Sequence, residues 1–548
     1  MENTTQEVAF PRLSDNEIAT IGPMGEHIVV ADGEVVFHAG QPNIDLFIVE
    51  SGSIEIVNPW DNRRIALHEK GGFSGDIDLL TRRPIVVTGV ARGETHLIKI
   101  PGDSVCELLM RHPQIGESLL EAFRARRILL NAQGNIGLKV YGGAECPETN
   151  LIREFLDKNF VPYTWYRRES FQSCTAEDPA GTGNAPTVDC GDGVVLTAPT
   201  LQHLAKCAGV WRECPAGTVD LAIVGAGPAG MSAAVYAASE GLSTLVLDRL
   251  GPGGQAASSS KIENFIGFPS GLSGTELATR AVIQMLKFGA QIVAPVCITK
   301  METAAEPGEP HLLHLDCGNV VKATNVLIAS GLAWRRLDAL GTSRLEHAGI
   351  HYACTTTEAI SHGSDEAAVV GAGNSAGQAA MFLAERYAKT VHIIVRGNDL
   401  GASMSSYLVD RILSMPNIVL HYGSQITRII EDGRLHGVEI ENASGETSII
   451  GVGALYVFIG AEPQIDWLPA EVARDEKGFL LTGGDAAAAG GWPLADRAPC
   501  ALETTVPHLF AAGDVRSSGT KRVGFAVGDG ALAVACVHTL RPHNAAAH

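Results

Sequence analysis

The chain has 548 residues, of which 45% are hydrophobic and 19% are charged. At about 150 residues per domain, this length predicts about three to four domains and argues against one compact core. Acidic residues (61) outnumber basic ones (41), so the formal net charge is −20. This excess of acid argues against a surface that binds nucleic acid or an anionic membrane.

Eleven cysteines are present, an odd number at irregular spacing with no CxxC pair. This pattern argues against structural disulfides and against a four-cysteine zinc site, and we expect no metal. The first residues are polar and mildly acidic, and no run of about 18 apolar residues occurs, so neither a signal peptide nor a transmembrane helix is expected. The reducing cytoplasm is the expected compartment.

The first region alternates apolar and polar residues between glycines, as in EVVFHAGQPNIDLFIVESGSIEIV. This alternation over residues 33–100 predicts antiparallel β-structure. Apolar residues at helical spacing follow, and Pro113 separates two helices. We therefore expect a small β-barrel followed by helices over residues 1–132.

The middle region, residues 133–214, reads as strand, helix, strand, hairpin and helix. The strand lies in IGLKVYG, and Pro147 opens the helix CPETNLIREFLDKNF. A hairpin across Gly191–Gly193 and a closing helix in TLQHLAKCAGV complete the order. This order predicts a separate α/β domain.

From about Thr218 the chain reads as doubly wound α/β with two nucleotide-binding units. In the first unit an apolar strand runs into Gly225-x-Gly227-x-x-Gly230, and a helix and a second strand ending at Asp248 follow. The glycines allow a tight turn, close approach to a pyrophosphate and close helix packing, and the carboxylate accepts from ribose hydroxyls. This order of strand, glycine turn, helix, second strand and carboxylate favours a dinucleotide site over a simple glycine turn.

The second unit repeats the pattern with Gly371, Gly373 and Ala376, but its second strand ends at Arg396. An arginine there suits a 2′-phosphate, so NADPH is favoured over NADH. A surface arginine without a ligand is the alternative. Two dinucleotide sites in one chain imply a flavin and a nicotinamide.

The pieces GPGGQ, IENFIGFP, IASG, GAGNSA and LFAAGDV make residues 218–548 similar to the low-molecular-weight thioredoxin reductases, class II pyridine nucleotide–disulfide oxidoreductases. The resemblance implies a homodimer and an FAD domain in two parts, residues 215–333 and 459–548, with an NAD(P) domain inserted at 334–458. The cofactor-binding residues that this assignment gives for FAD and NADP are Gly225, Gly227, Ala229, Gly230, Asp248, Gly254, Gln255, Asn264, Ser330, Gly331, Gly371, Gly373, Asn374, Ser375, Ala376, Arg396, Gly513, Asp514, Lys521 and Arg522. For the last two, a solvated basic pair is the alternative.

The residues that would pass electrons from the flavin to a disulfide differ from those of that family. Its members carry a redox CxxC just before the second glycine-rich turn. Here the stretch is HYACTTTEA, and the pair becomes Cys354-x-x-Thr357. A threonine hydroxyl cannot close a disulfide, so the usual relay is not available. The candidate acceptors are a thioredoxin-like disulfide reached through Cys354 or Cys146, or an external ferredoxin, quinone or oxygen. A flavin sensor that does not turn over is the alternative to an enzyme.

The middle region resembles a glutaredoxin-like thioredoxin fold. Cys146-Pro147-Glu148-Thr149 matches the one-thiol form of its motif, and a helix N-terminus favours a thiolate. Pro186 falls where that fold carries a cis-proline. A structural relic with an inert thiol is the alternative.

The first region resembles a cyclic-nucleotide-binding domain, with FSGDIDLLTRRPIVVTGVA in place of the phosphate-binding cassette. Asp76 stands for the cassette glutamate. The cassette arginine aligns near Ile85, with Arg82 and Arg83 close by. Without a bidentate arginine the phosphate loses its main contact, so regulation or scaffolding stands beside nucleotide sensing as a role for this domain.

Overall fold

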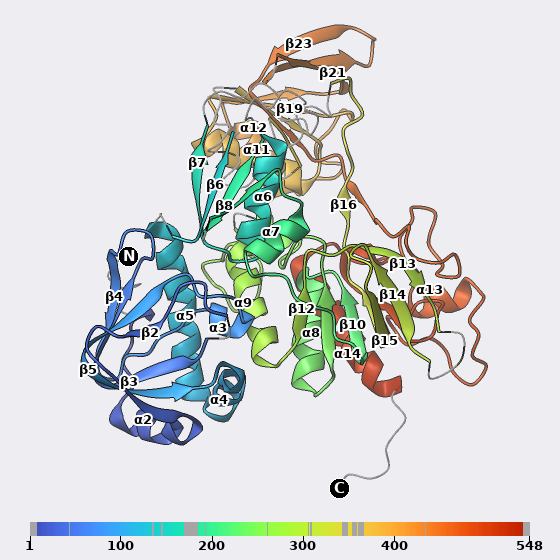
Figure 1. Cartoon of the computed structure of the whole chain (residues 1–548). Coiled ribbons are helices and arrows are strands. Elements are labelled where there is room, and N and C mark those ends of the chain that lie inside the picture. The colour runs from blue at the N-terminus through green and yellow to red at the C-terminus, as the bar shows by residue number, and fades with distance from the viewer. Residues whose placement is uncertain are drawn as a thin grey trace.

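The structure is a computed structural model, and its elements follow the chain through four folded parts (Figure 1). It describes residues 8–42, 44–133, 136–143, 146–168, 185–191, 193–259, 261–304, 306, 309–341, 349–352, 354, 359, 366–432 and 434–540.

The N-terminal domain is an antiparallel sheet with helices packed against it. Its strand order is β1-β5-β3-β4, and β2 also pairs with β5. Phe37 and Phe47 are buried in its core with their rings 5.8 Å apart. The expected break at Pro113 separates two helices, and closure of the sheet into a barrel stays a prediction. The elements are α2 (Asp15–Ile21), β1 (Glu26–Val30), β2 (Val35–Phe37), β3 (Leu46–Val57), β4 (Arg64–His68), α3 (Asp78–Thr81), β5 (Thr88–Ile100), α4 (Val105–Arg111) and α5 (Pro113–Gln133).

The middle domain is a four-stranded sheet of order β7-β6-β8-β9 that packs against two helices. Strands β6 and β7 are parallel, while β8 is antiparallel to both β6 and β9. Its core includes Val140, Phe155 and Val188, each with no exposed surface. The elements are β6 (Leu138–Gly142), α6 (Pro147–Lys158), β7 (Tyr163–Arg167), β8 (Thr187–Gly191), β9 (Val194–Thr197) and α7 (Leu201–Cys207).

Two expectations for this domain are wrong. A disulfide joins Cys190 to Cys207, 17 residues apart, with a Cα–Cα distance of 5.9 Å. Cysteine spacing could not show it, because the hairpin and α7 bring the two residues together only in the folded domain. The Ala185–Pro186 bond is not cis; among the described residues the cis bond is Ala294–Pro295. Trans is the ordinary preference of an X–Pro bond.

The domain to which the resemblance assigns FAD, hereafter the FAD-type domain, has a seven-stranded sheet of order β12-β11-β10-β15-β14-β13, with β26 added beside β15. Strand β26 comes from near the end of the chain, so the two ends of the region build one sheet. The elements are β10 (Thr218–Val224), α8 (Pro228–Ser239), β11 (Thr244–Leu247), α9 (Gly274–Lys287), β12 (Gln291–Val293), β13 (Ile298–Glu302), β14 (His311–Leu315), β15 (Val320–Ile328), α13 (Gly483–Ala488), β26 (Leu509–Ala511) and α14 (Val523–Leu540).

The inserted domain lies between these two parts. It has a parallel sheet of order β17-β24-β18-β19-β20 and a smaller antiparallel sheet, β21-β22-β23. Strands β16 and β25 pair antiparallel where the chain enters and leaves the inserted domain, and Figure 1 shows β16 at this junction. The elements are β16 (Ala333–Trp334), β17 (Ile350–His351), β18 (Glu366–Val370), α11 (Asn374–Arg386), β19 (Thr390–Ile394), α12 (Ser406–Ser414), β20 (Ile418–His421), β21 (Ser424–Glu431), β22 (Leu435–Asn442), β23 (Thr447–Gly451), β24 (Ala454–Val457) and β25 (Ala461–Glu462).

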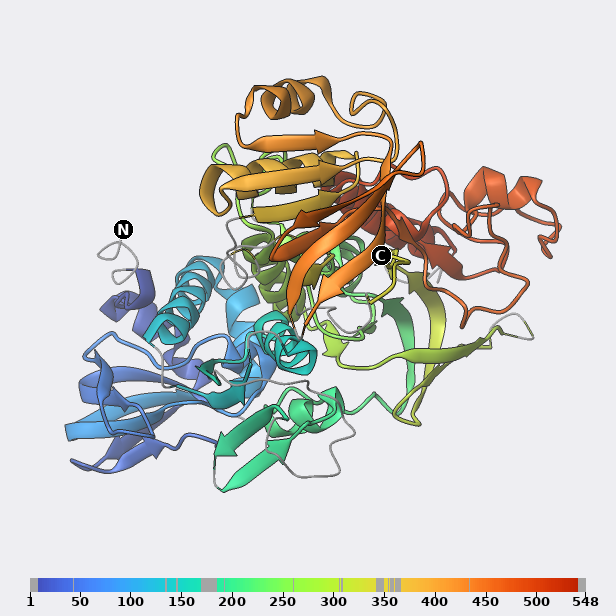
Figure 2. The same cartoon turned by 90° about the horizontal axis from the view of Figure 1, so that it is seen from above.

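The N-terminal and middle domains lie on one side of the dinucleotide-binding part (Figure 2). Helix α9 packs against α3 and α4 of the N-terminal domain, and the Cys106 thiol donates to the Leu286 carbonyl at 3.6 Å. The front domains are therefore in direct contact with the FAD-type domain.

Helix α14 is, in the described part of the chain, the one helix long and apolar enough to span a membrane by length and composition alone. The sequence predicted no such segment. In the structure α14 packs on α8, where a Cβ at Gly530 would lie 2.2 Å from the Ala229 carbonyl oxygen. The helix is thus a packed element of the FAD-type domain.

Candidate functional site: two glycine turns

The first glycine turn joins β10 to α8 and permits no side chain at two positions. Gly225 has φ of +107°, and a Cβ there would lie 2.4 Å from the Ala329 carbonyl oxygen. A Cβ at Gly230 would lie 1.9 Å from the Gly225 carbonyl oxygen. Gly227 caps α8 without a side-chain hydrogen bond. The first turn of α8 therefore offers backbone N–H groups and the positive end of the helix dipole to an anion.

The GPGGQ loop lies directly against this turn. The Gly253 N–H donates to the Ala226 carbonyl at 2.8 Å. Gly254 has φ of +54°, and a Cβ there would lie 2.9 Å from the Gly227 Cα. The Gln255 side-chain amide donates to the Leu332 carbonyl at 2.5 Å. Three loops that are distant in sequence thus meet at the end of β10.

Ser330 is the clearest sign of a missing partner in this group of loops. Its Oγ is buried and has no hydrogen-bond partner among the described residues. Buried hydroxyls are normally satisfied, so a polar group of a ligand fits here. The bare backbone beside Gly227 and Gly331, whose surroundings within 4 Å are open or backbone only, fits a bulky dinucleotide. The residues present therefore fit the FAD that the sequence predicts.

Asp248 has a role in the protein itself that sequence analysis missed. Its Oδ2 accepts from the Ala226 N–H at 2.8 Å, and its Oδ1 accepts from the Leu250 and Gly251 N–H groups at 2.9 and 2.8 Å. The carboxylate holds the glycine turn and the GPGGQ loop together. Its contact with ribose stays a prediction.

The Gly513–Asp514 turn also lies beside the first glycine turn, and a hydrogen bond to α14 holds it there. The Gly513 N–H donates to Asp529 Oδ2 at 3.0 Å, and Arg516 pairs with the same carboxylate at 3.2 Å. A Cβ at Gly513 would lie 3.0 Å from the Ala229 Cβ, so the turn lies beside the start of α8. Burial raises the pKa of Asp514, and the positive charge of Lys521 opposes that rise.

The other expected FAD residues lie at the surface. Lys521 is exposed and its Nζ lies 4.2 Å from the centre of the Phe479 ring. Partial desolvation of its ammonium lowers the pKa of Lys521, while the charge of Asp514 opposes that fall. Arg522 and Asn264 are also exposed. Nothing in the described residues brings Asn264 to the glycine turns.

The second glycine turn joins β18 to α11. Gly371 has φ of +133°, and a Cβ there would lie 2.3 Å from the Phe458 carbonyl oxygen. Gly373 caps α11 without a side-chain bond and has open space around it. Ala376 is fully buried and Ser375 is exposed. The turn is shaped like the first one and can receive a second pyrophosphate.

Two serines that sequence analysis missed brace the second turn. The Asn374 side-chain oxygen accepts from the backbone N–H and the hydroxyl of Ser405 at 2.8 and 3.0 Å. The Ser403 hydroxyl donates to the Ala372 carbonyl at 2.8 Å. Arg396 is exposed two residues after β19, with no ion pair or hydrogen bond among the described residues. Its guanidinium is thus available to a ligand.

The two candidate thiols lie in different domains. Cys354 is half-buried against the core of the inserted domain, and Thr357 lies outside the described residues. Cys146 caps α6 and is 1% exposed. The Thr149 N–H donates to its sulfur at 3.4 Å, and its thiol donates to Glu148 at 3.3 Å.

The far end of α6, not Cys146, contacts the GPGGQ loop. Lys158 Nζ donates to the Gly254 carbonyl at 3.0 Å, and the Asn159 amide donates to the Leu250 carbonyl at 2.8 Å. Twelve helical residues place Cys146 about 18 Å from this contact. The structure therefore does not bring Cys146 to the FAD turn.

The cassette residues form a buried ionic cluster. Arg127 pairs with Asp76 and Asp78 at 2.5 Å each, and Arg83 pairs with Asp78 at 3.4 Å. Arg83 also donates to the Asn159 carbonyl in the middle domain. Burial raises the pKa of Asp76, and it lowers the pKa of Arg83 to about 10.

This cluster does not fit a cyclic phosphate. Ile85, where the phosphate arginine aligns, is a buried apolar side chain. Arg83 is already engaged, and Arg82 is exposed and pairs with Asp103 at 3.0 Å. Arg82, Arg83 and Arg127 would each have to break an existing ion pair to meet a phosphate. Arg126, which donates to the Gly75 carbonyl, keeps a buried Nη2 with no hydrogen-bond partner among the described residues.

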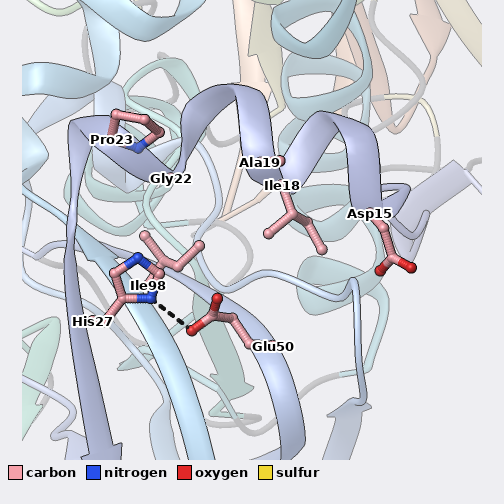
Figure 3. Close-up of a pocket in the computed structure, with 8 residues that line it drawn as sticks. All are labelled: Asp15, Ile18, Ala19, Gly22, Pro23, His27, Glu50 and Ile98. Carbon is pink, nitrogen blue, oxygen red and sulfur yellow. Dashed lines mark hydrogen bonds and ion pairs between the residues drawn. The ribbon is translucent and has the colours of Figure 1, made fainter.

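A separate hollow of about 430 Å³ lies beside α2, where His27 Nδ1 and Glu50 Oε2 are 2.9 Å apart (Figure 3). It shares no residue with the cassette or with either glycine turn. Among the described residues, no cluster of three or more His, Cys, Asp or Glu side chains is placed to hold a metal.

Known families match both ends of the chain. The model of pyridine nucleotide-disulphide oxidoreductases matches residues 219–530, and the model of cyclic nucleotide-binding domains matches residues 27–112. A thioredoxin reductase of Mycoplasma pneumoniae is 30% identical over 319 residues, covering 58% of this chain and 93% of that protein. A component of the alkyl hydroperoxide reductase of Staphylococcus epidermidis is 30% identical over 316 residues, but the match spans only 57% of its length and 57% of this chain.

Solved structures agree with this match. The thioredoxin reductase of T. acidophilum superposes with a TM-score of 0.51 at 28% identity, covering 59% of this chain and 98% of that one. The Lactococcus lactis enzyme in its FR conformation gives 0.52 at 26% identity, with the same coverage.

Proposed function

Because the chain belongs to the pyridine nucleotide-disulphide oxidoreductase family, we propose that it is an FAD-dependent reductase that takes electrons from NADPH and delivers them to a disulfide. The observation that carries FAD binding is the meeting of three loops around the unsatisfied Ser330 hydroxyl. When bound, FAD supplies the hydride acceptor between nicotinamide and disulfide.

Each of the two glycine turns binds one of the two dinucleotides in this proposal. Gly225, Gly227 and the N-terminus of α8 hold the FAD pyrophosphate, and Ser330 donates to or accepts from the cofactor. Gly371 and Gly373 hold the nicotinamide dinucleotide at the second turn. The exposed Arg396 supports recognition of a 2′-phosphate, and hence NADPH, because no other side chain of the described residues occupies it.

A thioredoxin-like disulfide is the proposed acceptor. Its support is the activity for which the relatives are named, among them a thioredoxin reductase and a component of an alkyl hydroperoxide reductase. Cys354 is the proposed thiol of the inserted domain, although its partner position holds Thr357. Ferredoxin, quinone and oxygen are the other acceptors to be tested.

We propose a thioredoxin-like fold for the middle domain, supported by the strand order β7-β6-β8-β9 and by a cysteine at the start of α6. Cys146 is covered, so exchange with an outside disulfide requires that its surroundings open first. A homodimer and a cytoplasmic location stay predictions.

An anaerobic titration tests the proposal. NADPH should bleach the bound flavin in one two-electron step, and a disulfide protein should reoxidise it through many turnovers. Cys354→Ser and Cys146→Ser report which thiol carries the electrons, since disulfide turnover surviving both would assign the step to neither. A flavin that is reduced once and that no disulfide, ferredoxin or quinone reoxidises would establish a sensor instead of an enzyme.

A further inference from the structure

The Cys190–Cys207 disulfide lies at a different end of the middle domain from Cys146. In the sheet, Lys139 pairs with Asp189, so Cys190 lies beside the beginning of β6, whereas Cys146 follows its end. The length of β6 separates these positions by about 13 Å. The disulfide is therefore a second candidate site for thiol–disulfide exchange in this domain, separate from the Cys146 motif.

Both sides of this disulfide contact the N-terminal domain. Next to Cys190, a Cβ at Gly191 would lie 3.7 Å from the Trp60 ring. The Lys139 ammonium, 3.9 Å from the Asp189 carboxylate, lies 3.7 Å from the centre of the same ring. The β8 end of the disulfide is thus held against the turn between β3 and β4.

The chain that follows Cys207, residues 208–212, runs over the end of the cassette, and we call it the strap. A Cβ at Gly209 would lie 2.3 Å from the Pro84 ring. Arg212 donates to the Thr81 and Arg82 carbonyls at 2.6 and 2.7 Å. Because Arg83 is buried between these contacts and the Asn159 carbonyl, the strap covers the segment that carries the ionic cluster.

Cys190 and Cys207 are both half-buried at the edge of the domain core, so neither residue is fully covered by the fold. Helix α7 has only seven residues, and its C-terminal end is fixed to the sheet by this covalent bond. Without the bond, the strap depends on its own contacts, chiefly those of Arg212 and the Val210 N–H to the Ala205 carbonyl at 2.8 Å.

We propose that Cys190–Cys207 is a redox-active disulfide that fixes the strap on the cassette. Reduction of this disulfide by a dithiol releases the strap. One thiolate of the dithiol attacks a sulfur of the pair, the S–S bond breaks, and the second thiol of the donor resolves the mixed disulfide. The pair gains two electrons and two protons and becomes two thiols, while the donor becomes a disulfide. This step needs no flavin, so it stands or falls separately from the proposed reductase activity.

Thiol labelling of the folded full-length chain tests the redox part. Dithiothreitol followed by an alkylating reagent and mass spectrometry should add two labels, at Cys190 and Cys207, with the circular dichroism spectrum unchanged. The Cys190→Ser, Cys207→Ser double variant should gain neither label. A pair that takes up label only after the domain unfolds would be purely structural and would overturn the proposal.

Hydrogen exchange tests the coupling to the cassette. On reduction, exchange over residues 208–212 and 78–84 should rise about thirtyfold, the factor expected from losing two ordinary hydrogen bonds. The double variant should exchange fast with or without reductant, and Cys106→Ser, which alters another half-buried thiol, should behave like the original chain. Equal exchange before and after reduction would show that the disulfide does not hold the strap.

Discussion

Gly254 lies directly against the first glycine turn and leaves little room for a side chain. Its φ is +54°, and the nearest atom to a Cβ added there is the Gly227 Cα at 2.9 Å. A side chain there adds backbone strain of about 1–2 kcal/mol and also pushes two glycine loops apart. The same two loops form the proposed pyrophosphate site.

We predict that Gly254→Ala lowers the amount of flavin bound per chain, measured by visible absorbance against protein concentration. Gly241→Ala is the matched control, because Gly241 has a similarly positive φ of +83° but no atom within 4 Å of its Cβ. It should keep its flavin. Equal flavin content in the two variants would contradict the close approach of the two loops.

Arg396 is exposed near the second glycine turn, so its substitution can test the preference for NADPH over NADH. Arg396→Ala should raise the KM for NADPH by about tenfold or more, as expected when a charge-assisted hydrogen bond is lost, and should leave the KM for NADH nearly unchanged. Steady-state kinetics with both nucleotides measures this. An equal rise for both would reject the assignment to the 2′-phosphate.

At the scale of elements, β14 carries a histidine that the sheet keeps neutral. His311 is 1% exposed, and its Nδ1 accepts from the Ala304 N–H at 3.2 Å. Burial, helped by the neighbouring His508, lowers the pKa of His311 to about 4. In the unfolded chain the same group titrates near 6.5, at about its ordinary value.

This depressed pKa predicts acid sensitivity. Below about pH 6.5 the unfolded chain takes up a proton that the folded sheet accepts only near pH 4, so the free energy of unfolding falls across that window, by up to about 3 kcal/mol. His311→Asn should flatten this decline in Tm between about pH 7.5 and 4.5, and the exposed His436→Asn should not. Parallel pH profiles for His311→Asn and the original chain would exclude this role.

The elements also show how far sequence reasoning reaches. The glycine turns were predictable, because each depends on residues within one strand-turn-helix unit. The bracing of Asn374 by Ser405, the clamp by Asp248 and the pairing of Cys190 with Cys207 depend on segments that meet only in the fold. The cassette could be placed from its sequence, but its burial by Asn159 could not, since that contact crosses a domain boundary.

At the scale of the whole molecule, Asn159 connects three domains. Its carbonyl accepts from Arg83 of the N-terminal domain, and its side-chain amide donates to the Leu250 carbonyl of the FAD-type domain. A Cβ at Gly251 would lie 2.6 Å from this amide, so the fit is close. The end of α6 is thus the meeting point of cassette and flavin loop.

We predict that Asn159→Ala lowers the free energy of unfolding by about 1–3 kcal/mol, since it leaves a carbonyl in the interface without its donor. Flavin should also leave the variant faster during dilution. Urea unfolding and the fluorescence of released flavin measure the two effects. Leu151→Ala, at an exposed position of the same helix, is the control, and an Asn159→Ala variant that behaves like it would refute the connection.

The buried ionic cluster has a consequence for how this chain can be divided. Asp76, Asp78 and Arg127 form the cluster within the N-terminal domain, but Arg83 completes its bonding with a carbonyl that the middle domain supplies. A fragment that ends before residue 133 leaves that guanidinium facing water or empty space, and one that starts at Thr218 uncovers Leu250. Each of these fragments would lack a hydrogen-bond partner that another domain supplies in the full chain. We therefore expect each domain, expressed alone, to be less stable than the same domain within the whole molecule.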